Sequence, residues 1–331
     1  MNNYASARIG ILGAGGYTGR ELARLASRHS RARIAWATSE SDAGKPLDDV
    51  IPGVDGPALV KAEDAPLSAV DVVISCLPHG DSALWMERAR QAGARAIDLS
   101  ADLRVPNAAT PAWAQGAVYG LPELHRARIA GTELVANPGC YPTAALLALA
   151  PLLRRGLVAG PVIVNAASGV TGAGRSPKRE LMFAELAEGF SAYAVGNVHR
   201  HLCEMKAQAA GLSEGGAAPE LVFTPHLLPV KRGILETIYV PLAEAVENPV
   251  EMWLDDYSSE PFVRVMTGRM PALADVVGSN RVAIGVVPVQ NVSMPMLTIV
   301  SVIDNLLKGA AGQAVQNLNL MLGWDEAEGL A

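Results

Sequence analysis

The first third of the chain alternates short apolar runs with stretches of helical periodicity. Four apolar runs predict β-strands at 8–13, 33–38, 70–75 and 94–99, and two helical stretches lie at 21–28 and 82–92. The run at 70–75 has the apolar continuity typical of a strand that is covered on both faces of a parallel sheet. Strands and helices that alternate at this spacing predict an α/β fold with a doubly wound parallel sheet.

The second half of the chain shows a different pattern. Its apolar runs predict strands that are widely spaced and joined by connectors with Pro and Gly, at 162–166, 221–224, 234–240, 282–287 and 296–302. This arrangement predicts an α+β domain around a mixed or antiparallel sheet. The tail from 306 to 322 is predicted to be one long amphipathic helix, with Ala310, Ala311, Ala314 and Val315 toward one side.

Composition narrows the functional classes. The 331 residues carry a net charge of −6 and only 5% aromatic residues, which argues against a nucleic-acid partner. The longest apolar helical run, 143–153, is too short to span a bilayer, and Met1–Ala7 lacks the apolar core of a signal peptide. Three cysteines form no disulfide framework, so we expect a cytoplasmic protein with no membrane contact.

A glycine-rich loop connects the first predicted strand to the first predicted helix. Its glycines stand at 13, 15, 16 and 19, a spacing closer to G-x-x-G-x-x-G than to G-x-G-x-x-G. Such a loop lets a phosphate approach backbone N–H groups at a helix N-terminus. Because a strand precedes the loop and a helix follows it, the sequence predicts a dinucleotide site.

The residues after the second predicted strand leave the choice between NAD and NADP open. Glu40 is placed to bind a ribose hydroxyl, as an acidic residue does in NAD sites. Thr38, Ser39 and Ser41 are equally suited to a 2′-phosphate, and Glu40 and Asp42 also fit a solvated loop.

Cys140 is predicted to begin a helix. Pro138 and Gly139 precede it, Pro142 lies where a helix starts, and the apolar run follows. The dipole and the free N–H groups of a helix N-terminus favour a thiolate, the form of Cys that attacks an acyl carbon. Cys76, inside an apolar strand, fits an ordinary packing role instead.

His199 and His201 form the only close histidine pair in the sequence, and we expect a proton acceptor for Cys140 among them. Their side chains face the same way in an extended segment and diverge by about 200° in a helix. A solvated surface pair is the alternative. No third ligand stands at metal spacing, so no metal is expected.

Two further loops follow predicted strands and end in arginine, at Arg104 and Arg175, and Lys231–Gly233 opens another strand. The guanidinium group suits phosphate and carboxylate. Together with Cys140 and the glycine loop, these residues predict a thioester-forming reductase of an acyl phosphate. A hydroxy-acid dehydrogenase is the runner-up, but it has no need of Cys140.

Several motifs resemble the N-acetyl-γ-glutamyl-phosphate reductase family. They lie at 118–123, 137–143, 168–175, 199–201, 232–236 and 304–311, and continue through Trp324. The resemblance implies reduction of N-acetylglutamyl 5-phosphate to the 5-semialdehyde with NADPH, in arginine biosynthesis, by a homodimer or homotetramer. It also implies a Rossmann-type NADP-binding domain over 1–140 and 305–331, and an α+β catalytic and dimerisation domain over 141–304.

The resemblance also implies roles for individual residues. Cys140 would be the nucleophile, either His199 or His201 the acid/base, and Arg104 and Arg175 the ligands of the phosphoryl group or the substrate carboxylate. The residues implied for the cofactor are Gly13, Gly16, Tyr17, Thr18, Gly19, Ser39, Pro78 and His79.

Cys203 is the one departure, because the family usually has Pro at that position. The missing Pro would alter the local turn and with it the pose of the histidines. Cys203 itself fits a packing role better than the alternative, a second reactive thiol. Related reductases act on carrier-bound aminoadipyl or glutamyl phosphate, or on aspartyl phosphate, but Tyr141-Pro-Thr143 is the arginine-type pattern. A regulator that binds nucleotides without catalysis is the remaining alternative, and Cys140 and the histidines argue against it.

Overall fold

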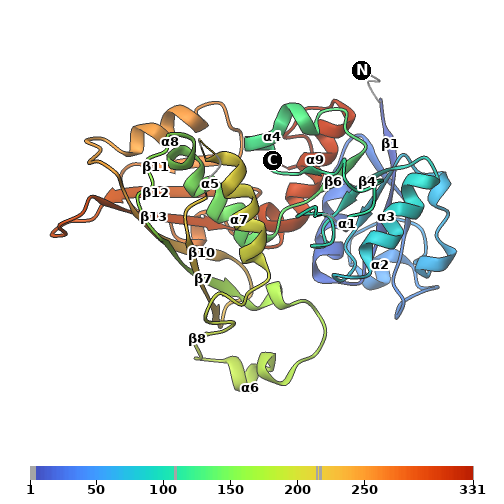
Figure 1. Ribbon diagram of the computed structural model, residues 1–331. Helices are drawn as coiled ribbons and strands as arrows, with labels where there is room; N and C mark the ends of the chain where they lie inside the picture. Colours follow the sequence, from blue (N-terminus) through green and yellow to red (C-terminus); the bar gives the residue numbers. More distant parts are fainter. Residues whose placement is uncertain (1–4, 108–109, 214, 216–217, 331) are drawn as a thin grey trace. The chain divides into compact units, whose positions relative to one another are not determined.

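The computed structural model describes residues 5–107, 110–213, 215 and 218–330 (Figure 1). The chain divides into two compact units, Met1–Gly139 with Ala310–Ala331 and Cys140–Gly309. Within the described residues, no helix combines the length and the apolar character needed to cross a membrane. Residues 1–4 of the start examined for a signal peptide lie outside the described residues.

The first unit is built on a parallel sheet with strand order β2-β1-β3-β4-β6-β5. The strands are β1 Ala7–Leu12, β2 Ala32–Ala37, β3 Val72–Ser75, β4 Arg95–Asp98, β5 Val118–Tyr119 and β6 Leu134–Ala136. The order of the strands reverses between β1 and β3, and ligands of such sheets bind outside the carboxyl ends of the strands at this point. The glycine loop follows β1 directly.

Helices cover both faces of this sheet, as predicted. They are α1 Tyr17–Arg28, α2 Leu47–Val50, α3 Ser82–Gln91, α4 Pro122–Ile129 and α9 Gly312–Leu322. One core joins Ile9 and Leu22 with Leu318, and the other joins Val73 with Met86. The sheet is therefore doubly wound, with separate apolar cores on its two faces.

The helix predicted over 306–322 is present, but it is not α-helical throughout and it is not amphipathic. A π-helical segment, Leu307–Ala311, precedes α9, and α9 is buried on all sides. The side-chain amides of Gln313 and Asn317 donate to the Gly120 carbonyl oxygen at 3.0 and 2.9 Å. Its polar residues are buried because they find hydrogen-bond partners inside the first unit.

The second unit contains a mixed sheet with strand order β11-β12-β13-β10-β7-β9-β8. The strands are β7 Val162–Gly169, β8 Ser191–Ala192, β9 Leu221–Leu228, β10 Ile234–Pro241, β11 Val263–Met266, β12 Val282–Pro288 and β13 Met296–Ile303. The pairs β7–β9 and β11–β12 are parallel and the other pairs are antiparallel. The predicted mixed sheet is thus confirmed.

Helix α5 packs on β10 and β13, with α7 and α8 beside it (Figure 1). The helices of this unit are α5 Cys140–Arg154, α6 Phe183–Leu186, α7 His201–Leu212 and α8 Val250–Tyr257. The Ser301 hydroxyl of β13 donates to the Ala144 carbonyl oxygen at 3.0 Å, which fixes the first turn of α5 on the sheet. This contact places the start of α5, and therefore Cys140, at one end of the sheet.

Candidate active site

The glycine loop of the first unit is shaped so that only glycine fits at two positions. Gly13 has a φ of +77°, and its N–H donates to the Thr38 hydroxyl at 3.0 Å. A Cβ at Gly19 would lie 2.3 Å from the Gly13 carbonyl oxygen. Helix α1 begins at Tyr17, directly after Gly16, so its first backbone N–H groups follow a turn made of three glycines and Ala14. This cradle fits a dinucleotide pyrophosphate.

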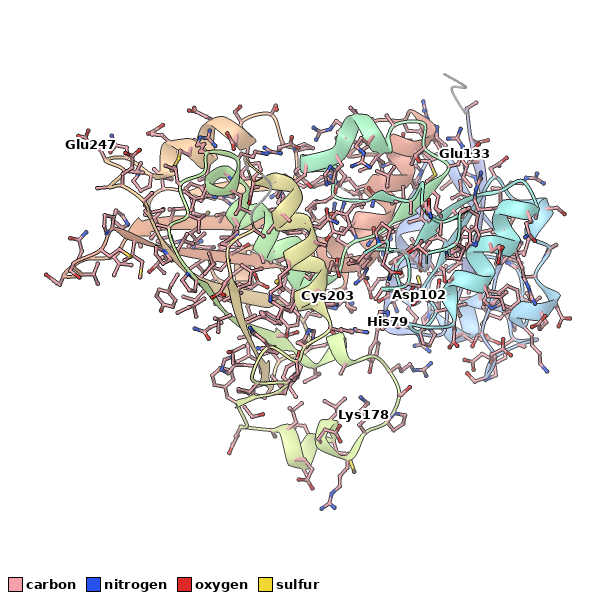
Figure 2. All side chains as sticks on the ribbon, in the orientation of Figure 1. His79, Asp102, Glu133, Lys178, Cys203 and Glu247 are labelled. Atoms are coloured by element: carbon pink, nitrogen blue, oxygen red, sulfur yellow. The ribbon has the colours of Figure 1, made fainter. Side chains whose placement is uncertain are left out.

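The segment after β3 lies beside the glycine loop. The Cys76 N–H donates to the Leu12 carbonyl oxygen at 2.9 Å, and a Cβ at Gly13 would lie 3.0 Å from the Cys76 carbonyl oxygen. Further along, His79 Nδ1 accepts the Ala101 N–H at 2.8 Å, and Asp102 accepts the Gly80 N–H (Figure 2). The neutral His79 ring therefore carries its proton on Nε2.

The polar residues after β2 have defined partners. Glu40 Oε1 accepts the Ala62 N–H at 3.0 Å, so this carboxylate binds the backbone. Ser39 is buried, and its Oγ would lie 2.8 Å from a Cβ at Gly15, which places Ser39 against the glycine loop. Lys45, bonded to Asp42 at 2.8 Å, lowers the pKa of that carboxyl to about 2.

Cys140 is the first residue of α5, where the sequence places it. Gly309 lies against it, because a Cβ at position 309 would stand 2.7 Å from the Cys140 Cβ. Cys140 thus sits at a helix N-terminus, the position that stabilises a thiolate, and the backbone at Gly309 fixes the place of its side chain.

An aromatic cluster surrounds Tyr141, the residue next to Cys140. The Tyr141 ring lies 5.5 Å from the His199 ring, 5.8 Å from the His201 ring and 5.2 Å from the Phe223 ring, between centroids. Its hydroxyl is 2.8 Å from the Tyr193 hydroxyl. Burial raises the pKa of Tyr141 and of Tyr193, so both phenols stay protonated.

The two histidines meet at the start of α7. His201 begins the helix and His199 precedes it, so the pair is neither wholly extended nor wholly helical. Their ring centroids are 4.9 Å apart, and His199 Nδ1 accepts the His201 N–H at 3.1 Å. Burial lowers the pKa of His199. The neutral His199 ring therefore exchanges its proton at Nε2.

The structure brings Tyr141, the residue next to Cys140, together with both histidines. Sequence reasoning missed Tyr193 and Phe223 as members of this cluster. Tyr193 lies 52 residues from Tyr141 along the chain, and no motif marks it.

The two predicted anion-binding arginines differ in environment. Arg104 is buried in the first unit, where its guanidinium donates to the carbonyl oxygens of Asn137 and Leu99 at 2.8 and 2.7 Å. Arg175 is exposed in the second unit, in the loop that follows β7.

The other two cysteines lack the environment of Cys140. Burial, together with the charge of Asp98, raises the pKa of the Cys76 thiol to about 12. Cys203 is exposed on α7, so the expected packing role is wrong (Figure 2). Its thiol donates to the Arg200 carbonyl oxygen at 2.9 Å. Position 203 lies in the first turn of α7, where Pro is also tolerated, so Cys leaves the helix start intact.

Among the residues that the structure describes, no group of three His, Cys, Asp or Glu side chains is arranged to hold a metal ion.

The fold matches a class of two-domain dehydrogenases. The NAD binding domain of semialdehyde dehydrogenases matches residues 8–132, and their dimerisation domain matches residues 140–305. Aspartate semialdehyde dehydrogenase II from Vibrio cholerae, complexed with ASA, has a TM-score of 0.78 at 19% identity, covering 96% of this chain and 98% of that one. The enzyme from Candida albicans with NADP has a TM-score of 0.71 at 15% identity, covering 96% and 98%. The class is therefore that of the semialdehyde dehydrogenases.

Closer relatives define the family. N-acetyl-gamma-glutamyl-phosphate reductases from Geobacter sp. (strain M21) and Magnetococcus marinus are 43% and 45% identical over 342 residues, each covering 98% of this chain and 97% of the relative. The reductase from Rhodopirellula baltica is 43% identical and covers 98% of both. The chain belongs to the N-acetyl-gamma-glutamyl-phosphate reductase family, which confirms the resemblance seen in the motifs.

Proposed function

We propose that the chain reduces N-acetyl-L-glutamyl 5-phosphate to N-acetyl-L-glutamate 5-semialdehyde and phosphate with NADPH, in arginine biosynthesis. One observation carries the chemistry: Cys140 begins α5, and the adjacent Tyr141 packs against both histidines. A thiol at a helix N-terminus is an activated nucleophile for acyl transfer, and a histidine packed against the next residue would be its proton acceptor. The family supports the choice of substrate.

The glycine loop fits the cofactor, since its shape excludes side chains at Gly13 and Gly19. When bound, NADPH supplies the hydride that reduces the acyl carbon. The residues that we propose to hold it are Gly13, Gly16, Tyr17, Thr18, Gly19, Ser39, Pro78 and His79. The first unit would thus be the cofactor domain and the second the catalytic domain.

Cys140 performs the covalent step. One histidine of the pair takes the thiol proton, and the thiolate sulfur attacks the acyl carbon. A C–S bond forms, the bond from the acyl carbon to the phosphate oxygen breaks, and the imidazolium returns the proton to the departing phosphate. After reduction, collapse of the adduct re-forms the C=O bond and breaks the C–S bond, and the released thiolate takes up a proton from solvent through the histidine, which restores the thiol.

Both His199 and His201 stay in the proposal as the acid/base. His199 Nδ1 accepts the backbone N–H of His201, so the neutral His199 ring carries its exchangeable proton on Nε2. His201 is buried beside it. His199→Asn and His201→Asn, compared at equal cofactor saturation, separate the two. The residue whose loss removes the pH dependence of kcat is the acid/base.

We further propose that Arg104 and Arg175 hold the phosphoryl group and the substrate carboxylate. Guanidinium groups bind both anions, and Arg175 would do so through paired N–H donors. Nε and Nη2 of Arg104 already donate to backbone carbonyl oxygens, so Arg104 would contribute chiefly its positive charge. The protein would act in the cytoplasm as a homodimer or homotetramer, on small molecules, with no nucleic-acid or membrane partner and no metal.

The proposal is tested in the reverse direction, with N-acetylglutamate semialdehyde, phosphate and NADP, by the absorbance of the reduced cofactor. Cys140→Ser is expected to abolish turnover while NADP affinity, measured by fluorescence titration, stays within about twofold. Cys203→Ser is the matched control and is expected to retain activity, because that thiol is exposed and bonded only locally.

A parallel measurement in this assay tests the choice of substrate. Aspartate semialdehyde, supplied in place of the N-acetylated substrate, is expected to be turned over poorly. Absence of phosphate-dependent turnover with N-acetylglutamate semialdehyde would contradict the proposed reaction.

A further inference from the structure

The loop after β2 carries a carboxylate that is surrounded by side-chain donors. Ser39 and Ser41 donate their hydroxyl protons to Asp42 Oδ2 at 3.2 and 3.0 Å, and the Lys45 ammonium group donates to Asp42 Oδ1 at 2.8 Å. Only 14% of the Asp42 side chain is exposed to solvent. Three donors from one short loop therefore converge on a single anion.

This group of side chains lies against the glycine loop. A Cβ at Gly15 would lie 2.8 Å from Ser39 Oγ and 3.8 Å from Asp42 Oδ2. In a doubly wound sheet, the residues that follow the second strand recognise the 2′ position of the adenosine ribose of a dinucleotide. Asp42 and its donors therefore belong to the ribose end of the proposed cofactor site.

The backbone holds the loop in this conformation. Gly44 has a φ of +87°, which a residue with a side chain rarely adopts, and its N–H donates to the Leu59 carbonyl oxygen at 2.7 Å. The Lys45 N–H then donates to the Asp42 carbonyl oxygen at 3.1 Å. This turn brings Lys45 back onto Asp42, so the backbone itself favours the ion pair.

Two hydroxyl groups and an ammonium group are also the donors that a phosphate monoester takes. Lys45 lowers the pKa of Asp42 to about 2, so the carboxylate is ionised at neutral pH. The other acidic residue of the loop, Glu40, binds the Ala62 N–H and does not share these donors. The loop thus contains its own anion at the position where NADP, unlike NAD, carries a phosphate.

We propose that Asp42 is an internal competitor of the cofactor 2′-phosphate and sets how strongly the chain prefers NADP to NAD. The inference rests on the proposed function and deepens its cofactor site. A 2′-phosphate would need the donors of Ser39, Ser41 and Lys45, which Asp42 engages, and two anions that share these donors repel each other. NAD has a hydroxyl group at this position and leaves the ion pair in place. Asp42 therefore weakens the binding of NADP and not that of NAD.

The first test measures binding without turnover. Dissociation constants of NADP and NAD are determined by isothermal titration calorimetry for the purified full chain and for Asp42→Asn, with no substrate present. Asp42→Asn is expected to lower the dissociation constant of NADP at least about fivefold and to leave that of NAD within about twofold, since it removes the competing charge. Asp49→Asn is the matched control, because it removes the same charge from an exposed position on α2. It is expected to change neither constant.

Three results of this test overturn the inference. They are an unchanged NADP constant in Asp42→Asn, an equal gain in Asp49→Asn, which would assign the effect to net charge, and weaker NAD binding in Asp42→Asn, which would make Asp42 a ligand of the ribose hydroxyls. Each of them leaves the proposed function standing. If the unaltered chain binds neither NADP nor NAD, the proposed function fails together with the inference.

A second measurement locates the effect at the 2′ position. Adenosine 2′,5′-bisphosphate differs from 5′-AMP only by the 2′-phosphate, and Asp42→Asn is expected to tighten the binding of the bisphosphate alone. Lys45→Met in the Asp42→Asn background is expected to reverse this gain, because it removes the charged donor that the phosphate would take over. An equal gain for 5′-AMP, or a gain that survives Lys45→Met, overturns the inference, since the effect would then arise elsewhere in the cofactor site.

Discussion

Glu236 is a buried carboxyl group without a hydrogen-bond partner among the described residues. It lies in the middle of β10, between Ala166 of β7 and Ser301 of β13, and its side chain is fully inaccessible to solvent. Burial raises the pKa of Glu236 well above its ordinary value. Glu236 is therefore protonated in the folded chain under conditions where the unfolded chain ionises it.

This difference predicts a pH-dependent effect of Glu236→Gln on stability. Above about pH 4.3 the unfolded chain loses the Glu236 proton and the folded chain keeps it, so the folded state becomes less stable as pH rises. Glutamine cannot ionise. As pH rises, the free energy of unfolding of the variant is therefore expected to increase relative to that of the unaltered chain, by up to about 1.4 kcal/mol per pH unit. The increase ends when the pH passes the pKa of Glu236 in the folded chain. Urea titrations at pH 5, 6 and 7 measure the gain, and a constant difference would contradict it.

Tyr193→Phe tests the hydroxyl pair beside the histidines. The variant keeps the ring near His199 and removes the bond to the Tyr141 hydroxyl. Loss of one such bond is expected to lower kcat roughly twofold to tenfold by loosening Tyr141, while KM for NADP stays unchanged. Tyr239→Phe on β10 is the control and is expected to leave both constants alone. A change in KM for NADP, with kcat preserved, would exclude this positioning role.

At the scale of elements, the π-helical segment Leu307–Ala311 lies against the start of α5. A Cβ at Gly309 would lie 2.7 Å from the Cys140 Cβ and 3.2 Å from Ile303 Cδ1. Both neighbours are fixed, Ile303 in the sheet and Cys140 at the helix start. π-helical turns of this kind are frequent at functional sites.

Gly309→Ala is therefore expected to displace Cys140 without unfolding the chain. Overpacking of this kind costs about 1–3 kcal/mol. We expect kcat to fall at least about tenfold and the alkylation rate of Cys140 by iodoacetamide to change. Gly268→Ala is the control, since a Cβ there meets nothing within 4 Å. Unchanged Cys140 reactivity in Gly309→Ala would show that the helix start tolerates the extra methyl group.

The elements also show how far the sequence predicts this fold. The apolar runs predicted the long strands, because a hydrophobic pattern can be recognised only over several residues. Pro142 predicted the start of α5. The two-residue strands β5 and β8 carry no such signal and form only because a neighbouring strand pairs with them. The pattern failed at α9, since burial of Asn317 depends on partners at Gly120 and Asn137, far away in the sequence. Likewise the position of Cys140 at a helix start was predictable from its neighbours in the sequence. Tyr193 was not predictable, because it contacts Tyr141 from 52 residues away along the chain.

At the scale of the whole molecule, the net charge opposes the proposed substrate. The chain carries −6, and an acyl phosphate with a carboxylate is itself an anion. The electrostatic field of the whole molecule would therefore repel this substrate, and the proposed ligands Arg104 and Arg175 would supply the local attraction. Arg104 is buried and bonded to backbone carbonyls, whereas Arg175 is exposed, so salt screens the charge of Arg175 more strongly.

Arg175→Gln separates the attraction of Arg175 for the substrate anion from the repulsion of that anion by the net charge of the chain. If Arg175 binds the phosphoryl group, its loss is expected to raise KM for phosphate in the reverse direction about tenfold at low salt. In the unaltered chain, KM is expected to rise with potassium chloride because the attraction is screened. In Arg175→Gln, KM for phosphate should rise less with salt. The local attraction is already lost there, and salt screens only the repulsion by the net negative charge. Arg264→Gln on β11 removes the same charge from an exposed position and should reproduce the salt dependence of the unaltered chain. If both variants show one and the same salt dependence, the net charge governs binding and Arg175 is not a ligand.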